Sequence, residues 1–163
     1  MRPLLLLDVD GPLNPYAADQ PPPGYLRHEI VEGDRSWVVH LNPQHGEALR
    51  VLTATFDLVW ASSWEHGANR LLSPLLGLPQ LPTILWPDRT PVARGSWKTP
   101  YVAKWVGDCP FLWVDDGVDA EDAAQFPADH QLVWPVDPRI GLTPADFAAI
   151  GKAFAANAKW PHS

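Results

Sequence analysis

The sequence is poor in cysteine, in long apolar runs and in cationic residues. Its one cysteine, Cys109, excludes an internal disulfide framework and a zinc site built from several cysteines. No apolar run has the length of a membrane span, and the segment after Met1-Arg2 lacks the apolar core and cleavage site of a signal peptide. We therefore expect a reduced, cytoplasmic protein without a membrane anchor.

The deficit of positive charge bears on nucleic-acid binding. Lys and Arg number 12 against 19 Asp and Glu, which gives a formal net charge of −7. This charge argues against an extended surface for a nucleic-acid backbone, although a local basic pocket remains compatible with it. No His-x-x-x-His spacing occurs, so we interpret the six histidines as surface or loop residues: His28, His40, His45, His66, His130 and His162.

Length and composition indicate one globular domain over residues 1–163. The chain is 46% hydrophobic and 19% charged, which is typical of a folded protein with a full core. Nine tryptophans are unusual for 163 residues and could stack bases. Four of them lie in apolar segments and are interpreted first as core residues: Trp60, Trp86, Trp113 and Trp134.

Strand-like and helix-like segments alternate along the chain. We predict strands at 4–7, 56–61, 83–86, 111–114 and 131–134, and helices at 44–54, 65–76, 96–107, 120–126 and 143–158. A loop and a hairpin of strands 25–31 and 36–41 occupy residues 14–41. This alternation predicts an α/β, three-layer Rossmann-like fold, with a central parallel sheet and helices on both faces.

The run Leu4–Leu7 ends abruptly at Asp8-Val9-Asp10-Gly11. Open α/β sheets bind their ligands at the carboxyl ends of the strands, where these aspartates would emerge. Alternation along a strand would point Asp8 and Asp10 toward one site, and Gly11 would let the backbone turn and approach a ligand. A strand followed by an Asp-rich turn is the simpler alternative.

Polar residues also follow the other predicted strands. Ser62 ends the second strand and Asp115-Asp116 ends the fourth, while Lys98 precedes a helix. Two carboxylates 4 Å apart repel by roughly 4 kcal/mol at an effective dielectric of 20, so such a cluster needs a cation. All-oxygen ligands select Mg²⁺ over zinc, and a hydroxyl and an ammonium beside Mg²⁺ suit a phosphoryl group. The pattern therefore indicates phosphoryl chemistry.

These pieces, in this order, resemble the haloacid dehalogenase-like (HAD) superfamily over about residues 4–120. Asp8-Val9-Asp10-Gly11 is the specific part of the resemblance. Further segments are similar to the small HAD domains of bacterial RNA-repair proteins: Leu58–Trp64, Ala68-Asn69, Leu112–Asp116, Val136-Asp137-Pro138 and Gly141-Leu142-Thr143. Pro12 departs from the usual pattern, in which Thr or Val follows the glycine.

The resemblance implies a role for each matching residue. Asp8 would be the nucleophile that forms an aspartyl-phosphate, and Asp10 would be the general acid and base. The carboxylates of Asp8, Asp115 and Asp116 and the backbone carbonyl of Asp10 would bind Mg²⁺. An Asp at position 10 favours a phosphatase over a dehalogenase. Which member of the Asp115-Asp116 pair binds the ion directly stays open.

The same resemblance implies that Ser62, Lys98 and Gly11 contact the phosphate. Ser63 is an alternative to Ser62, and Arg94 and Lys104 are alternatives to Lys98. Three acidic residues could add a metal contact but are better interpreted as a helix start: Asp119, Glu121 and Asp122. Glu65, His66 and Asn69 are consistent either with the mouth of the site or with capping and packing.

Residues 14–41 have room only for a loop and a hairpin flap, and residues 77–97 have no room for a large cap domain. An open site would accept a phosphate on a large molecule, such as a nucleic-acid end, or a small phosphomonoester. Local contacts to RNA or a nucleotide would come from Arg27, Arg35, Arg70, Arg89 or Arg94. We thus expect a Mg²⁺-dependent HAD phosphatase, with a catalytically idle binding or accessory module as the alternative. A phospho-receiver domain is excluded because its acidic pair precedes its phospho-accepting Asp.

Overall fold

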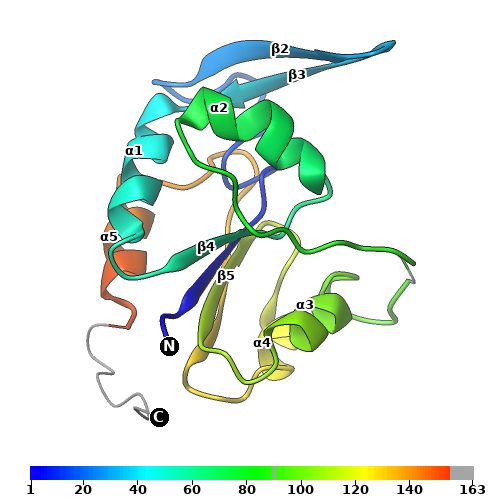
Figure 1. Cartoon of the computed structure of the whole chain (residues 1–163), viewed down its shortest axis with the longest axis vertical. Helices are drawn as coiled ribbons and strands as arrows, with labels where there is room; N and C mark the ends of the chain where they lie inside the picture. The colour runs from blue at the N-terminus through cyan, green and yellow to red at the C-terminus, as the bar shows by residue number, and fades with distance from the viewer. Residues whose placement is uncertain (90, 155–163) are drawn as a thin grey trace.

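The opening leucine run is an inner strand of a four-stranded parallel sheet (Figure 1). The computed structural model describes residues 1–89 and 91–154. Leu7 lies opposite Trp60 on one side and Val114 on the other, so the carboxyl ends of these strands share one edge. In spatial order the strands are β4 (Asp57–Trp60), β1 (Leu4–Leu7), β5 (Phe111–Asp115) and β6 (Gln131–Pro135).

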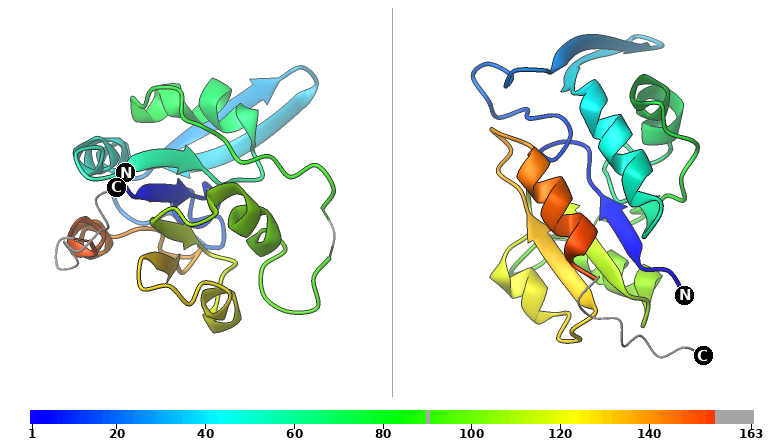
Figure 2. Two further views of the ribbon diagram at one scale, coloured as in Figure 1. Left: turned by 60° about the horizontal axis from the view of Figure 1, so that its bottom comes forward. Right: turned by 90° about the vertical axis from the view of Figure 1, so that its left-hand side faces the viewer.

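Helices cover both faces of this sheet (Figure 2), which confirms the predicted three-layer α/β Rossmann-like fold. Leu5 and Leu7 enter the apolar cluster under one set of helices, and Leu6 enters the cluster on the other face. All three are fully buried, and burying a leucine stabilises the fold by about 2 kcal/mol. The first face is covered by α1 (Pro43–Leu52), the π-helix η1 (Ala68–Leu72), α2 (Ser73–Leu76) and α5 (Pro144–Lys152); the second by α3 (Thr99–Val106) and α4 (Ala120–Ala124).

The predicted hairpin is present as β2 (Leu26–Glu32) and β3 (Arg35–Leu41), an antiparallel pair beyond the end of the main sheet (Figure 1). Gly33 makes its turn with a positive φ of 63°. Ile30 and Val39 anchor the hairpin in the main core, while the rest of it is largely exposed. Within residues 1–89 and 91–154, no folded insertion larger than this hairpin covers the sheet edge.

Two helices begin with side-chain caps, near the starts predicted at residues 44 and 143. Asn42 caps α1 by accepting a hydrogen bond from the Gln44 N–H, and Pro43 occupies the first helical turn. Thr143 caps α5 and forms a capping box with Asp146. The predicted end of this last helix, at residue 158, lies outside the described residues. No helix of the described residues combines the length and apolarity needed to cross a membrane.

Three predicted elements differ from the structure. Residues 83–86 do not form a strand; only Thr83 bridges Trp60, because Pro82 and Pro87 bound the segment too tightly for a ladder. The helix predicted at residues 65–76 is present from His66 to Leu76 but includes the π-helix η1, and Glu65 lies outside it in a turn with a φ of 50°. The helix predicted from Ser96 begins at Thr99, and Pro100 fits because it stays in the first turn.

His45 is a buried histidine of α1, contrary to the prediction that the histidines lie at the surface or in loops. Its side chain is 4% exposed and packs against the rings of Tyr25 and Phe147. Among the described residues its Nδ1 has no hydrogen-bond partner. Burial lowers the pKa of His45 from 6.5 to about 4, and a hydrogen bond to the Leu142 backbone opposes this shift only in part.

Replacing His45 by Phe is expected to remove a pH dependence of stability. Because the folded-state pKa lies near 4 and the unfolded-state pKa near 6.5, the unfolded chain binds the proton more tightly. The stability contributed by neutral His45 is therefore full above pH 6.5 and is lost as the pH falls toward 4. The loss is about 3 kcal/mol. Urea unfolding between pH 7 and 4 measures it, and His66→Phe, at an exposed site, should leave the wild-type slope. Equal slopes for all three proteins would contradict this prediction.

Candidate active site

Asp8 lies directly beyond the end of β1, on the wall of a cavity of about 590 Å³. Its Oδ1 accepts a hydrogen bond of 2.8 Å from the Val9 N–H, and its Oδ2 lies 3.1 Å from Lys98 Nζ. The side chain is 5% exposed. Asp8 is thus a buried carboxylate held in one orientation at the carboxyl edge of the sheet.

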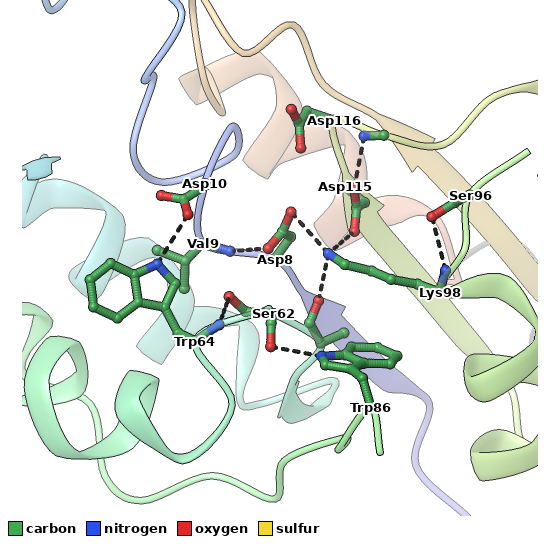
Figure 3. A network of polar contacts seen from close by, with 12 residues as sticks. Asp8, Val9, Asp10, Ser62, Trp64, Trp86, Ser96, Lys98, Asp115 and Asp116 are labelled. Atoms are coloured by element: carbon green, nitrogen blue, oxygen red, sulfur yellow. Dashed lines mark hydrogen bonds and ion pairs between the residues drawn. The ribbon is translucent and has the colours of Figure 1, made fainter. Parts of the chain in front are cut away.

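Lys98 reaches this carboxylate from the start of α3. Its ammonium lies 2.7 Å from Asp115 Oδ2 and 3.1 Å from Asp8 Oδ2, and it donates a 3.2 Å hydrogen bond to the Ala61 carbonyl (Figure 3). An ammonium has three N–H donors, so all of them are used. Trp86 and Trp97 also flank it, with ring centroids 5.8 and 5.9 Å away. The structure therefore brings together Lys98, Asp8 and Asp115, which the sequence predicts to share one site.

One cation does not neutralise the carboxylates around it. Burial raises the pKa of Asp8 well above its usual value, and the nearby charge of Asp115 raises it further. Burial also raises the pKa of Asp115. For Lys98, burial acts to lower the pKa, but the charges of Asp8 and Asp115 outweigh it and raise the pKa. The ammonium is therefore well satisfied, whereas the carboxylates need additional positive charge to be fully ionised together.

Asp8, Asp115 and Asp116 form an acidic group that fits a divalent cation. One carboxylate oxygen from each residue lies within 4.8 Å of the others. All three donors are hard oxygen ligands, which suit Mg²⁺. Hydrogen bonds orient two of these carboxylates: Asp115 Oδ1 accepts from the Gly117 N–H at 2.8 Å, and Asp116 Oδ2 accepts from the Tyr16 hydroxyl at 2.7 Å. The residues present therefore match the metal implied by the sequence resemblance.

Gly11 lies against Asp116. Its φ is +102°, and a Cβ built on it would come within 2.6 Å of the Asp116 Cβ and Cγ. Glycine is therefore required here both by the backbone conformation and by the close approach of Asp116. The Gly11 N–H donates to the Asn14 carbonyl at 2.8 Å, so in this structure it holds a local turn.

Replacing Gly11 by Ala is expected to destabilise the protein by about 1–3 kcal/mol through backbone strain, and to weaken Mg²⁺ binding because Asp116 must move. Urea unfolding and calorimetric Mg²⁺ titration measure the two effects. Gly33→Ala is the matched control, because Gly33 has a positive φ of 63° but no neighbouring atom within 4 Å of the added Cβ. The Gly33→Ala control should lose stability but keep the Mg²⁺ affinity of the wild-type protein. Unchanged Mg²⁺ affinity in Gly11→Ala would argue against Asp116 as a ligand.

Asp10 lines the same cavity as Asp8, but its side chain has different partners. Its Oδ2 accepts a 3.1 Å hydrogen bond from Trp64 Nε1, and its Oδ1 accepts one of 2.9 Å from Asn14 Nδ2. Figure 3 shows Asp10 turned toward Trp64 and away from the Lys98 cluster. Strand alternation does not apply, because β1 ends at Leu7. The two aspartates face one cavity from different sides.

The two candidate serines have different environments. Ser62 is fully buried, and its Oγ accepts a 3.2 Å hydrogen bond from the Trp64 N–H while its carbonyl accepts one of 2.9 Å from Trp86 Nε1. Ser63 is exposed and lines the cavity beside Asp8 and Asp10. The structure therefore places Ser63 on the cavity wall and Ser62 behind it.

The other candidates from the sequence lie elsewhere. Arg94 is exposed and lies 3.6 Å from Glu121, and Lys104 is in the last turn of α3. Asp119 caps α4, forming a capping box with Asp122. Asn69 is structural, because its side chain accepts from Trp60 Nε1 and the Leu81 N–H and donates to the Leu81 carbonyl and Thr83 Oγ1.

Sequence reasoning did not find the partners that orient the aspartates: Trp64, Asn14 and Tyr16. For Trp64 the sequence does indicate a position near the site, because this residue follows Ser62-Ser63 at the end of a predicted strand. Asn14 and Tyr16 lie in a segment that the sequence marks only as a polar, proline-rich loop. Tyr16 and Asp116 are 100 positions apart in the chain, so no local pattern relates them.

Comparison with family models matches residues 4–147 to the HAD domain in Swiss Army Knife RNA repair proteins. The match includes β1, the acidic group and Lys98, and it confirms the resemblance inferred from Asp8-Val9-Asp10-Gly11. A search among curated proteins found no match to the chain.

Proposed function

The chain belongs to the family of HAD domains in Swiss Army Knife RNA repair proteins, and from this premise we propose that it is a Mg²⁺-dependent phosphatase. Its substrate is a phosphomonoester at a nucleic-acid end, hydrolysed through an aspartyl-phosphate intermediate. The proposal is carried by one juxtaposition: Lys98 lies between Asp8 and Asp115 at the wall of an open cavity. The family supports a HAD-type hydrolase; the metal, the reaction and the substrate belong to the proposal.

Asp8 is the proposed nucleophile. Its carboxylate oxygen attacks phosphorus, the bond from phosphorus to the leaving oxygen breaks, and Asp10 donates a proton to that oxygen. In the second step Asp10 takes a proton from water, the water oxygen attacks phosphorus, and the bond from phosphorus to Asp8 breaks to release phosphate. The hydrogen bonds from Trp64 and Asn14 fix the orientation of the Asp10 carboxylate at the cavity wall, which supports this role.

The charged groups of the site stabilise the phosphoryl oxygens. Lys98 neutralises charge on the phosphate and on the aspartyl intermediate, next to which it is already placed. The carboxylates of Asp8, Asp115 and Asp116 and the backbone carbonyl of Asp10 would hold Mg²⁺, which would supply further positive charge to the phosphoryl oxygens. The Ser62 hydroxyl is the proposed hydrogen-bond donor to the phosphate, with Ser63 as the alternative. Comparing Ser62→Ala with Ser63→Ala decides between them.

An open site suits a phosphate carried by a large molecule. The cavity beside Asp8 holds about 590 Å³, and the described ranges 1–89 and 91–154 contain no folded insertion larger than the hairpin that could cover it. The net charge of −7 disfavours a long nucleic-acid footprint. Recognition of one end, through a few local contacts, is compatible with both observations.

Phosphate release from a small panel tests the proposed function. Wild-type protein, with Mg²⁺ or with EDTA, is incubated with p-nitrophenyl phosphate, glycerol phosphate and RNA and DNA oligonucleotides phosphorylated at the 3′ or the 5′ end. We expect release that depends on Mg²⁺ and is fastest with an oligonucleotide end. No release from any member by folded, Mg²⁺-binding protein would favour an accessory module over a phosphatase.

A further inference from the structure

A second cavity adjoins the one beside Asp8. It holds about 330 Å³, and Asp10 and Ser63 line both cavities. The two spaces therefore meet at Asp10. If Asp10 protonates the leaving oxygen, as proposed above, the group that departs with this oxygen must lie beside Asp10. The second cavity is the space in which such a group fits.

The walls of the second cavity are aromatic. Trp37 comes from β3 of the hairpin and Trp64 from the turn before η1, and their ring centroids are 5.4 Å apart at an interplanar angle of 57°. Both side chains are half-buried, so they pack on the core while part of each ring faces the cavity. Flat aromatic surfaces of this kind bind planar rings by stacking, independently of base identity.

The cavity also has one unneutralised cation. Arg70 forms a bidentate ion pair with Glu32, in which each of the two N–H···O hydrogen bonds has an N···O distance of 2.8 Å. Arg35, also on the wall, forms no ion pair with any residue in the described part of the chain, and it is exposed. An aromatic wall beside a free guanidinium matches a ligand that has both a planar ring and a second anionic group.

We infer that this cavity is the leaving-group subsite and that it binds the nucleoside of a nucleoside phosphate. The base packs against Trp37 and Trp64, and Arg35 contacts the phosphate next to the one being hydrolysed. The inference rests on the proposed function. A free mononucleotide and the last nucleotide of an oligonucleotide share this chemistry, but only the oligonucleotide has a neighbouring phosphate for Arg35.

Trp37 is the best residue to replace. Trp64 also donates to Asp10, so its loss would disturb the acid–base group together with the cavity. Within residues 1–89 and 91–154, the ring of Trp37 packs against Trp64 and not against a residue of the Lys98 cluster, and Trp37→Leu keeps an apolar side chain against the core. Trp37→Ala removes the ring altogether. The two variants together separate stacking from packing, and thermal unfolding verifies that each is folded.

The experiment compares kcat/KM for glycerol phosphate, nucleoside 3′- and 5′-monophosphates and the matching phosphorylated oligonucleotides. Loss of one stacked base corresponds to a decrease of roughly 5- to 150-fold. We expect both Trp37 variants to lower kcat/KM by this factor with nucleotides and by a clearly smaller factor with glycerol phosphate, which has no base to stack. Arg35→Gln should lower kcat/KM for oligonucleotides only, and the decrease should be larger at low salt, where charge–charge attraction is less screened. Trp105→Ala on α3 and Arg27→Gln on β2, which line no part of this cavity, are the matched controls.

Each outcome separates the inference from the proposed function. If Trp37→Ala lowers kcat/KM equally for glycerol phosphate and for nucleotides, the proposed subsite is wrong. The proposed phosphatase activity is not contradicted by that result. If no phosphate ester is hydrolysed, calorimetric titration of the wild-type protein with the same nucleotides decides the subsite alone. Nucleotide binding that is weakened by Trp37→Leu but not by Trp105→Ala would support the subsite. Absence of nucleotide binding would overturn the subsite. A preference for mononucleotides, unaffected by Arg35→Gln, would assign the cavity to free nucleotides.

Discussion

Asp8→Asn is expected to lower kcat for phosphate release by about 10⁴-fold or more while leaving the protein folded. The amide keeps the size of the side chain, and its oxygen can still accept from the Val9 N–H. It is a far weaker nucleophile than a carboxylate and has no charge to offer Lys98 or Mg²⁺. Single-turnover phosphate release at saturating Mg²⁺ measures the loss.

The stability of the same variant gives an internal control. Burial raises the pKa of Asp8, so the ionised carboxylate is disfavoured in the folded state, and its replacement by a neutral amide should not reduce the free energy of unfolding. Asp129→Asn, at an exposed loop position, should leave both activity and stability unchanged. Activity of Asp8→Asn within tenfold of wild type would exclude Asp8 as the nucleophile.

Lys98→Met is expected to destabilise the metal-free protein by about 3–5 kcal/mol, because it leaves the buried carboxylates of Asp8 and Asp115 without their cation. Urea unfolding in EDTA measures this change. Added Mg²⁺ should recover part of the loss, since the ion replaces some of the missing positive charge. Lys104→Met, in the last turn of the same helix, is the control and should change stability by no more than about 0.5 kcal/mol.

The pH dependence of this variant has a definite sign. In the folded state the pKa of Asp8 is raised above its unfolded value by burial and by Asp115, so the folded protein binds the proton more tightly. The contribution of Asp8 to stability is therefore greatest at low pH and is lost as the pH rises through the raised pKa. Removing Lys98 raises this pKa further, so the deficit of Lys98→Met relative to wild type should shrink on acidification. A deficit that stays constant from pH 8 to pH 4 would show that lost packing, rather than charge, is the cause.

The sequence predicted the edge of the sheet well and the orientation of its side chains poorly. A run of four leucines followed directly by Asp8 is typical of a buried parallel strand, and in the same way Asp115 ends β5 and Asp116 follows it. Chain order alone therefore places Asp8, Lys98 and Asp115 together. Strand alternation, in contrast, gives no information beyond Leu7, where β1 ends and Asp10 turns toward Trp64.

The missed elements have local physical causes. The predicted strand at residues 83–86 has an apolar composition, but prolines on both sides leave only the Thr83 bridge. The helix predicted at residues 65–76 forms from His66 onward, but Glu65 adopts a positive φ of 50° in the turn before it, and five residues of the helix are π-helical. Within η1, Asn69 forms side-chain hydrogen bonds to the backbone of Leu81, 12 positions further along the chain. Periodicity carries no information about such contacts.

The amide of Asn14 joins the hairpin to Asp10, since its Oδ1 accepts from the His40 N–H at 3.0 Å while its Nδ2 donates to Asp10. Spontaneous deamidation would turn this donor into a second carboxylate facing Asp10. That reaction requires the backbone N–H of the following residue, and Pro15 has none. The same dipeptide protects Asn42, the cap of α1, which precedes Pro43. The contacts made by these two side chains should therefore outlast prolonged storage of the protein at neutral pH.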